Sequence, residues 1–403
     1  MLDISDVREA RERVSETARR TPLDYSHTFS TMTGAEVSLK LENFQRTGSF
    51  KIRGATNRIK TLTDAEKTAG VVTASAGNHA QGVALAASRV GVDSKIVMPE
   101  NAPISKIKAT RSYGAEVVLH GADYDEAAER AHEIERAEDR TYVHAFDDEM
   151  VMAGQGTIGL EIVEDCPEVD TVVVPIGGGG LISGIATAVK AYDPEIRVVG
   201  VQAEGASSVA TSLQKGAIHE LDAVDTIADG IATRSVGERP FEVIQERVDE
   251  VATVPDGDIA MAITHLLERS KTMVEGAGAV PLAAVLEGHL DYDEDEVIVP
   301  ALCGGNIDLN MLTTVIMRGL VETGRYLKVR TVLEDQPGSL ENLLEVIADM
   351  RANIYAIQHD RTSREIGMSD TEVELDLETR GPEHVDRLLA ELRDQGYEVD
   401  VLV

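Results

Sequence analysis

TVVVPIGGGGLISGIATAVKAY, residues 171–192, is the stretch that decides the fold class of this chain. It begins with a continuous run rich in valine, which is typical of a strand buried on both faces of a parallel sheet. Four glycines then separate this run from an apolar helical pattern. A strand, a glycine turn and a helix in this order predict an α/β fold.

The same alternation of apolar runs and helical patterns extends from about residue 37 to 320. Helices between buried runs imply parallel sheets, and this many runs suggest two of them. We therefore expect two open α/β subdomains with mostly parallel sheets, preceded by an amphipathic helix at residues 5–20. The further runs are VSLKLE (37–42), GVVTAS (70–75), SKIVMP (94–99), AEVVLHG (115–121), IRVVGVQA (196–203) and VIVPALCGG (297–305).

The pattern changes near residue 325, where alternating runs with one solvated face replace the continuous ones. The order βαββαβ predicts a ferredoxin-like module. We expect a main domain over residues 1–322, with a small subdomain at roughly 50–150, and a separate module over 326–403. In this module we expect strands at 325–334, 353–361, 371–379 and 396–403, and helices at 339–350, with Ser339 as N-cap, and at 381–395.

Charge and composition exclude several classes of function. The net charge of −33 argues against nucleic-acid binding, because so acidic a surface repels phosphates. The 11 Lys against 27 Arg fit a protein from a high-salt cytoplasm, with an ordinary acidic bacterial enzyme as the alternative. Cys166 and Cys303 have neither zinc-site nor disulfide spacing. We expect a soluble cytoplasmic protein, since the charged start is unlike a signal peptide and no run of about 18 apolar residues could cross a membrane.

Four segments could carry chemistry, and the first is TGSFKIRG at residues 47–54. Lys51 stands in an apolar, glycine-flanked stretch, where burial would lower the pKa of its amine. A neutral amine can attack a carbonyl and form a Schiff base. For an isolated lysine, a surface position at a helix start is the better explanation.

Two further segments lie between a strand and a helix, where free N–H groups and the helix dipole suit an anion. SAGNHAQG (75–82) could hold a carboxylate or phosphate, and Asn78 could donate to a phenolate oxygen. Ser75 could instead be a helix N-cap, and His79 a structural histidine. The four glycines from Gly177 could form a nest of N–H groups around a phosphate, with a flexible loop as the alternative.

The fourth segment is CGGN at residues 303–306, at the end of an apolar run. Strand ends in α/β sheets line the ligand crevice, and a thiol there can hydrogen-bond a ring nitrogen weakly. Taken alone, Cys303 is more simply a small core residue.

Together and in this order, the four segments resemble the fold-type II family of pyridoxal-phosphate enzymes, most closely its threonine and serine dehydratases. The resemblance covers residues 1–320 and includes GQGTIGLEI (154–162) and TIADGIA (226–232). It implies that Lys51 carries pyridoxal 5'-phosphate and acts as the catalytic base. The cofactor-binding residues that it implies are Phe50, Lys51, Asn78, Gly177, Gly178, Gly179, Gly180, Leu181 and Cys303. The substrate-binding residues that it implies are Ser75, Ala76, Gly77, Asn78 and His79.

One match to the family and two departures from its racemases bear on the expected activity. A neutral Cys303 thiol would leave the pyridine nitrogen unprotonated, which favours loss of a β-leaving group. Related serine racemases carry a second serine where this chain has Ala76, so we expect elimination rather than racemisation. They also bind a divalent cation with two carboxylates. Glu204 matches one of these but Ala210 stands in place of the other, so we expect no metal.

Residues 326–403 resemble an ACT-type regulatory module through DQPGSL (335–340) and ANI (352–354). Such modules pair side by side and hold a small amino acid at the shared edge. A dehydratase that makes 2-oxobutanoate feeds isoleucine synthesis, so we expect isoleucine as the effector and valine as a candidate antagonist, with a purely structural role of the module in assembly as the alternative. The resemblance implies effector contacts at Gly338 and Asn353. It also implies a homo-oligomer, a dimer or tetramer.

The expected activity is that of a threonine ammonia-lyase, which converts L-threonine to 2-oxobutanoate and ammonia, and L-serine to pyruvate. Isoleucine biosynthesis or threonine catabolism would be its setting. A serine racemase or β-replacement enzyme on the same fold is one alternative. A non-catalytic amino-acid sensor is another, against which the intact Lys51 argues.

Overall fold

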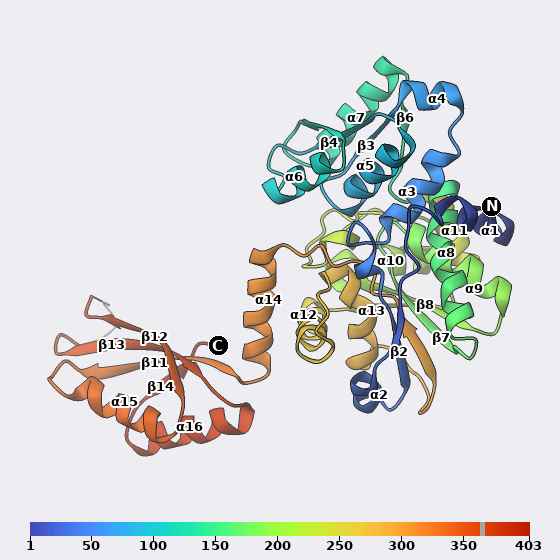
Figure 1. Cartoon of the computed structure of the whole chain (residues 1–403). Helices are drawn as coiled ribbons and strands as arrows, with labels where there is room; N and C mark the ends of the chain where they lie inside the picture. Colours follow the sequence, from blue (N-terminus) through green and yellow to red (C-terminus); the bar gives the residue numbers. More distant parts are fainter. Residues whose placement is uncertain (363–366) are drawn as a thin grey trace. The chain divides into compact units, whose positions relative to one another are not determined.

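Parallel and antiparallel sheets divide between two structural units of the chain, Met1–Asp308 and Leu309–Val403 (Figure 1). The structure is a computed structural model that describes residues 1–362 and 367–403. The division falls before the helix α14 (Leu309–Glu322), whereas we placed the boundary after residue 322. The functional boundary therefore stays a prediction.

The larger sheet of the first unit has the strand order β1-β2-β10-β7-β8-β9. β1 runs antiparallel to β2, and the four other pairs are parallel. Val172, Val173 and Val174 of β7 are all 0% exposed, as expected of a strand buried on both faces. The strands are β1 Leu23–Tyr25, β2 Glu36–Lys40, β7 Thr171–Pro175, β8 Arg197–Ala203, β9 Glu250–Val254 and β10 Val297–Pro300.

The smaller sheet has the order β5-β4-β3-β6 and is parallel throughout. Its alternate residues face two different cores. Val71 and Ile96 pack with residues of α3, α5 and α6, and Val72 and Val97 pack with residues of α7. The expectation of two α/β subdomains with mostly parallel sheets is confirmed. The strands are β3 Val71–Ala74, β4 Ser94–Met98, β5 Glu116–Leu119 and β6 Thr141–Tyr142.

Helices of the first unit cover these sheets and join the subdomains, since α8 packs against both α3 and α9. The predicted end of the first helix, residue 20, is wrong, because α1 ends at Val14. Just after it, the Ser15 side chain takes up a backbone acceptor of the last turn, since its hydroxyl donates to the carbonyl of Glu12. The helices are α1 Ile4–Val14, α2 His27–Thr33, α3 Lys51–Lys60, α4 Asp64–Ala69, α5 Asn78–Val90, α6 Ile104–Ser112, α7 Tyr124–Glu138, α8 Glu149–Asp165, α9 Gly180–Tyr192, α10 Ser208–Lys215, α11 Glu238–Arg247, α12 Asp256–His265 and α13 Gly276–Leu286. Among the described residues, no helix has the length and apolar character needed to cross a membrane.

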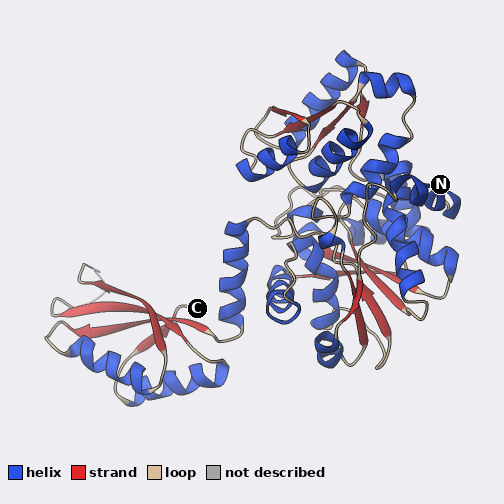
Figure 2. Ribbon diagram, viewed as in Figure 1, coloured by secondary structure: helices blue, strands red, loops and turns tan. Residues whose placement is uncertain are grey.

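The second unit contains the predicted βαββαβ order, folded as an antiparallel sheet with the strand order β12-β13-β11-β14. Both of its βαββαβ helices cover the same face of this sheet (Figure 2). Leu343 of α15 and Leu388 of α16 are 0% exposed and share one core with Leu375 of β13. The elements are β11 Tyr326–Glu334, α15 Ser339–Asp349, β12 Asn353–Asp360, β13 Asp370–Glu378, α16 Pro382–Asp394 and β14 Val399–Val401.

The start of α15 corrects one prediction. Gly338, with φ 97°, is the N-cap, and Ser339 is the first residue of the helix. No side chain makes a capping hydrogen bond at this helix start. A glycine takes this left-handed conformation without strain, so the turn itself sets the helix start. The prediction of Ser339 as N-cap is wrong.

Candidate active site

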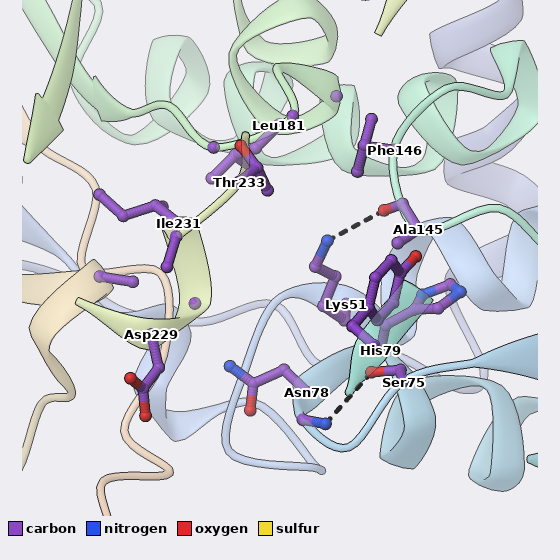
Figure 3. A pocket seen from close by; sticks show the side chains of 18 of the residues that line it. Lys51, Ser75, Asn78, His79, Ala145, Phe146, Leu181, Asp229, Ile231 and Thr233 are labelled. Atoms are coloured by element: carbon purple, nitrogen blue, oxygen red, sulfur yellow. Dashed lines mark hydrogen bonds between the residues drawn. The ribbon is translucent and has the colours of Figure 1, made fainter. Parts of the chain in front are cut away.

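The four segments singled out in the sequence meet around one cavity of about 540 Å³ in the first unit (Figure 3). Three of them follow the carboxyl ends of β3, β7 and β10. Parallel strands place these ends at one edge of each sheet, where α/β proteins bind their ligands. The predicted residues that line the cavity are Phe50, Lys51, Ser75, Gly77, Asn78, His79, Gly177, Gly178, Gly179, Gly180, Leu181 and Cys303.

Ala76 is the predicted site residue that is not part of this lining. Its neighbours Ser75 and Gly77 line the cavity, while Ala76 packs against the apolar core of the small subdomain. Its role toward substrate stays a prediction.

Lys51 is the first residue of α3, and its amine reaches into the cavity (Figure 3). Its Nζ donates to the carbonyl of Ala145 at 2.9 Å and lies 5.1 Å from the centre of the Phe50 ring. Burial lowers the pKa of Lys51 to about 8, against the opposing effects of Cys303 and Glu275. At a pKa of about 8, roughly a tenth of the amine is neutral at pH 7, far more than for an unperturbed lysine.

The 75–79 segment leads into α5, which begins at Asn78 with Gly77 as N-cap. The Ser75 hydroxyl accepts from the N–H of Gly77 at 3.1 Å, so the alternative of Ser75 as N-cap is wrong (Figure 3). His79 is buried, and its Nε2 bonds the carbonyl of Val143 at 2.9 Å. Burial lowers the pKa of His79 to about 3, which makes the ring neutral.

The glycine loop ends at Gly179, the N-cap of α9, whose φ of 90° favours glycine. Gly178 is required for another reason, because the Phe146 ring fills the space that a Cβ would occupy. The first N–H groups of a helix have no intrahelical acceptor, so they are available to an anion. Thr233 also lines the cavity, and its hydroxyl is buried without a hydrogen-bond partner among the described residues.

Cys303 and Glu275 form the wall beyond Lys51. Burial raises the pKa of the Cys303 thiol well above its usual value, so the group is neutral. The Glu275 carboxyl accepts from the Asn78 amide at 2.6 Å, and burial raises the pKa of Glu275 to about 7. The backbone carbonyl of Cys303 also accepts from the N–H of Phe50 at 3.1 Å, which ties the Lys51 segment to the end of β10.

Several lining residues were not predicted from the sequence. Ala145 and Phe146 belong to no motif, and Asp229 was quoted only within the stretch 226–232. Glu275 precedes a helix, where a carboxyl has an ordinary explanation as a capping group. The missed residues include Ala145, Phe146, Asp229, Thr233 and Glu275.

These side chains fit pyridoxal phosphate. An amine of lowered pKa suits an aldehyde, and an N–H-rich helix start with an unpartnered hydroxyl suits a phosphate. A neutral thiol suits an unprotonated ring nitrogen. Fold and cavity together define an enzyme that uses pyridoxal phosphate.

Comparison with known proteins supports this class. Residues 14–304 match the family described as pyridoxal-phosphate dependent enzyme, and the chain belongs to this family. The L-threonine ammonia-lyases of Geobacter sulfurreducens and Thermotoga maritima are 49% and 46% identical to it over 402 residues, with complete coverage of both chains in each case.

Solved structures give the same result for the first unit. Threonine deaminase isoform 2 of Solanum lycopersicum superposes with a TM-score of 0.74 at 38% identity, covering 78% of this chain and 94% of that one. The serine racemase of maize also has a TM-score of 0.74, at 37% identity, covering 80% of this chain and 98% of that one. The fold is thus common to both activities, and the site must decide between them.

Glu204 and Ala210, the two positions that correspond to the divalent-cation site of racemases, lie in neighbouring elements. Glu204 begins a short 3-10 helix, and Ala210 lies in α10. In the described part of the chain, no group of three or more His, Cys, Asp or Glu side chains is placed to hold a metal ion.

Proposed function

We propose that this protein is an L-threonine ammonia-lyase that converts L-threonine to 2-oxobutanoate and ammonia. Relatives of that name align with the chain from end to end. The observation that carries the proposal is the Lys51 amine of lowered pKa in a cavity with a glycine loop and a neutral thiol. L-Serine, which lacks only the β-methyl group, would be a second substrate.

Lys51 would hold the cofactor, with Phe50 beside its ring and Asn78 at its phenolic oxygen. The loop Gly177–Gly180, with Leu181 and Thr233, would hold its phosphate, and Cys303 would face its ring nitrogen. When bound, pyridoxal phosphate supplies an aldehyde that condenses with amines and a ring that stabilises negative charge on the α-carbon.

The protein's own groups would then bind the amino acid and move its protons. The start of α5 offers N–H groups to the substrate carboxylate, beside Ser75 and His79. Once the amino group of the substrate has taken its place on the cofactor, the released Lys51 amine would remove the α-proton as general base. The carbonyl of Ala145, 2.9 Å from Lys51 Nζ in the structure, would orient it. The neutral His79 ring, whose Nε2 bonds the carbonyl of Val143, adds no charge at this position.

Elimination over racemisation is supported in this proposal by the resemblance alone, in which related serine racemases carry a serine at the position of Ala76. Racemisation needs a proton donor on the opposite face of the α-carbon, and an alanine cannot transfer a proton. We therefore expect ammonia and 2-oxo acid as products, with little D-amino acid.

The test is a product assay of the purified, cofactor-loaded protein with a panel of amino acids. Equal amounts of 2-oxobutanoate and ammonia from L-threonine are expected. D-Serine formed from L-serine in excess over pyruvate would favour a racemase. A yellow protein that releases no ammonia from any amino acid would contradict lyase activity.

For the second unit we propose an ACT-type regulatory role, with isoleucine as activator or inhibitor and valine as antagonist. Its complete βαββαβ fold and separate core support this, since the catalytic unit does not need it to close its own core. Gly338 and Asn353 are the proposed contacts, and sheet-to-sheet pairing would make a dimer or tetramer. A role in isoleucine biosynthesis and a cytoplasmic location stay predictions from the sequence.

Isoleucine titration of the full-length enzyme tests this role. Coupling of about 1–3 kcal/mol would shift the threonine affinity roughly 5- to 150-fold. Asn353→Ala should weaken the response while the activity without isoleucine is kept. An enzyme unmoved by isoleucine and valine would leave only a structural role for the unit.

A further inference from the structure

The side-chain amide of Asn78 is oriented by a chain of hydrogen bonds that starts at a backbone carbonyl. The carbonyl of Thr47 accepts from Asn306 Nδ2 at 2.7 Å. A carbonyl can only accept, so the NH₂ group of Asn306 must face it. The same Nδ2 donates its second hydrogen to Asn78 Oδ1, also at 2.7 Å.

The orientation of Asn306 fixes that of Asn78 in turn. With Oδ1 facing Asn306, the NH₂ group of Asn78 faces Glu275 and donates to Oε1 at 2.6 Å. An amide nitrogen carries two hydrogens. Within the part of the chain that the structure describes, one N–H of Asn78 therefore remains for a ligand in the cavity that Asn78 and Glu275 both line.

The packing around Glu275 supports a dedicated role in this network. Glu275 occupies the N-cap of α13, but its side chain makes no capping hydrogen bond. Its backbone N–H donates to the carbonyl of Gly304 at 3.0 Å. A Cβ on Gly304 would collide with Glu275 Oε1 and lie 3.3 Å from Asn78 Nδ2. The absence of a side chain at position 304 thus makes room for this hydrogen bond.

The charges around Glu275 show which form it takes. Lys51 of α3, Lys106 of α6, Asp229 of the 3-10 helix Asp229–Ile231 and Cys303 interact with it electrostatically. Burial raises the pKa of Glu275 to about 7, while the Asn78 hydrogen bond, Lys106 and a hydrogen bond from the backbone of Asn306 oppose this rise. Below that pH the carboxyl is neutral and places no negative charge beside an oxygen that Asn78 would bind.

We propose that Glu275 and Asn306 are positioning residues, which hold the Asn78 amide so that its remaining N–H faces the phenolic oxygen of the cofactor. Neither residue touches the reacting atoms in this scheme. The proposal rests on the cofactor site given under Proposed function.

The test is a double-mutant cycle read out as cofactor affinity. Apoprotein is titrated with pyridoxal phosphate, and the dissociation constant is taken from the absorbance of the bound cofactor. Asn78→Ala and Glu275→Met should each weaken binding about tenfold, through loss of one hydrogen bond. The double variant should bind no more weakly than Asn78→Ala alone, because Glu275 acts only through Asn78.

Glu275→Gln is the matched control, since its amide oxygen can accept from Asn78. The dissociation constant of pyridoxal phosphate should lie within about twofold of the wild-type value. The substitution should also abolish any spectral change that follows the ionisation of Glu275. Thermal unfolding of each apoprotein checks folding. If Glu275→Met does not fold, Asn306→Ala combined with Asn78→Ala completes the same cycle.

Two results would overturn the proposal. One is a further tenfold loss when Glu275→Met is added to Asn78→Ala, since the effects would then be independent. The other is Glu275→Gln binding as weakly as Glu275→Met, because an acceptor would not be what matters. Wild-type protein that binds no pyridoxal phosphate would instead refute the proposed function itself.

Discussion

Helix α3 carries two basic side chains two residues apart, a buried Arg53 and a half-buried Lys51, and they differ in their hydrogen-bond partners and in the direction of their pKa shifts. Arg53 is 1% exposed, and its guanidinium donates to Glu42 and Glu161 at 2.7–2.9 Å. The Lys51 amine donates to a backbone carbonyl, and among the described residues it forms no ion pair with a carboxylate. The pairing with carboxylates raises the pKa of Arg53 against the effect of burial, whereas burial lowers that of Lys51.

The difference teaches that burial alone does not mark a reactive group. Lys40 also pairs with Glu161, at 2.7 Å, so the Arg53 cluster holds two cations and two carboxylates and is neutral overall. A cation paired with a carboxylate keeps its proton and is therefore not a nucleophile or a base. An unpaired buried amine loses its proton easily and can serve as nucleophile or base.

Removing the amine of Lys51 should have the largest effect. Lys51→Ala should bind no coloured cofactor and lose at least about 10³-fold in threonine-dependent ammonia release. Its melting temperature should stay at or above that of the wild type, because the variant buries no unpaired amine. Threonine-dependent ammonia release at the wild-type rate would refute the role of Lys51.

Removing the paired cation should act on stability instead. Arg53→Met leaves the buried Glu42 with the Thr21 hydroxyl but without the cation that pairs with it, and Glu161 with Lys40 alone, so we expect a loss of about 3–5 kcal/mol in the free energy of unfolding. Urea denaturation of the apoprotein measures it. A loss below about 1 kcal/mol would mean that the pairing is not what stabilises the helix.

The comparison can be sharpened at the glycine loop, where packing rather than charge sets the geometry. Gly178→Ala should displace the Phe146 ring and weaken cofactor binding by about 1–3 kcal/mol. Phe146→Ala makes room for the new methyl group, so the double variant should regain part of the affinity. A double variant as weak as the sum of both losses would contradict this contact.

The lowered pKa of Lys51 can be followed directly by pH. The amine is protonated below about 8 and neutral above, so the rate of cofactor attachment to apoprotein should rise with pH and level off above about 8. An unperturbed lysine, with a pKa of 10.5, would show the rise more than two pH units higher. Stopped-flow absorbance distinguishes the two profiles.

Salt should change the stability least for each charged group, but it acts on the repulsion between all charges of the surface. At a net charge of −33, self-repulsion weakens as salt shortens the screening length to about 3 Å at 1 M. The melting temperature should therefore rise between low and molar KCl. A flat or falling curve would count against the high-salt interpretation.

The sequence predicted those parts of the fold that carry strong local signals. The buried run that begins at residue 171 forms β7, and the alternating runs after residue 325 form β11, β12, β13 and β14, as expected. Three short strands, β1, β6 and β9, were missed. β6 has two residues, too few for any periodicity, and it exists because it pairs with β3.

The site shows the same limit. Lys51 and Cys303 were found because their segments occur together in a known order. Phe146 and Glu275 reach the cavity through tertiary packing, and each has an ordinary local explanation, so no pattern in the sequence distinguishes them. Ala76 is the converse case, a residue inside a motif whose side chain packs against the core.

The position of the cofactor is the most direct test of the whole account. The yellow protein is treated with borohydride, which fixes pyridoxal phosphate to the amine that holds it, then digested and analysed by mass spectrometry. We predict that the modification lies on the peptide containing Lys51 and is absent from the peptide containing the buried, paired Lys40. Modification of Lys40 or of any other lysine in place of Lys51 would contradict the assignment.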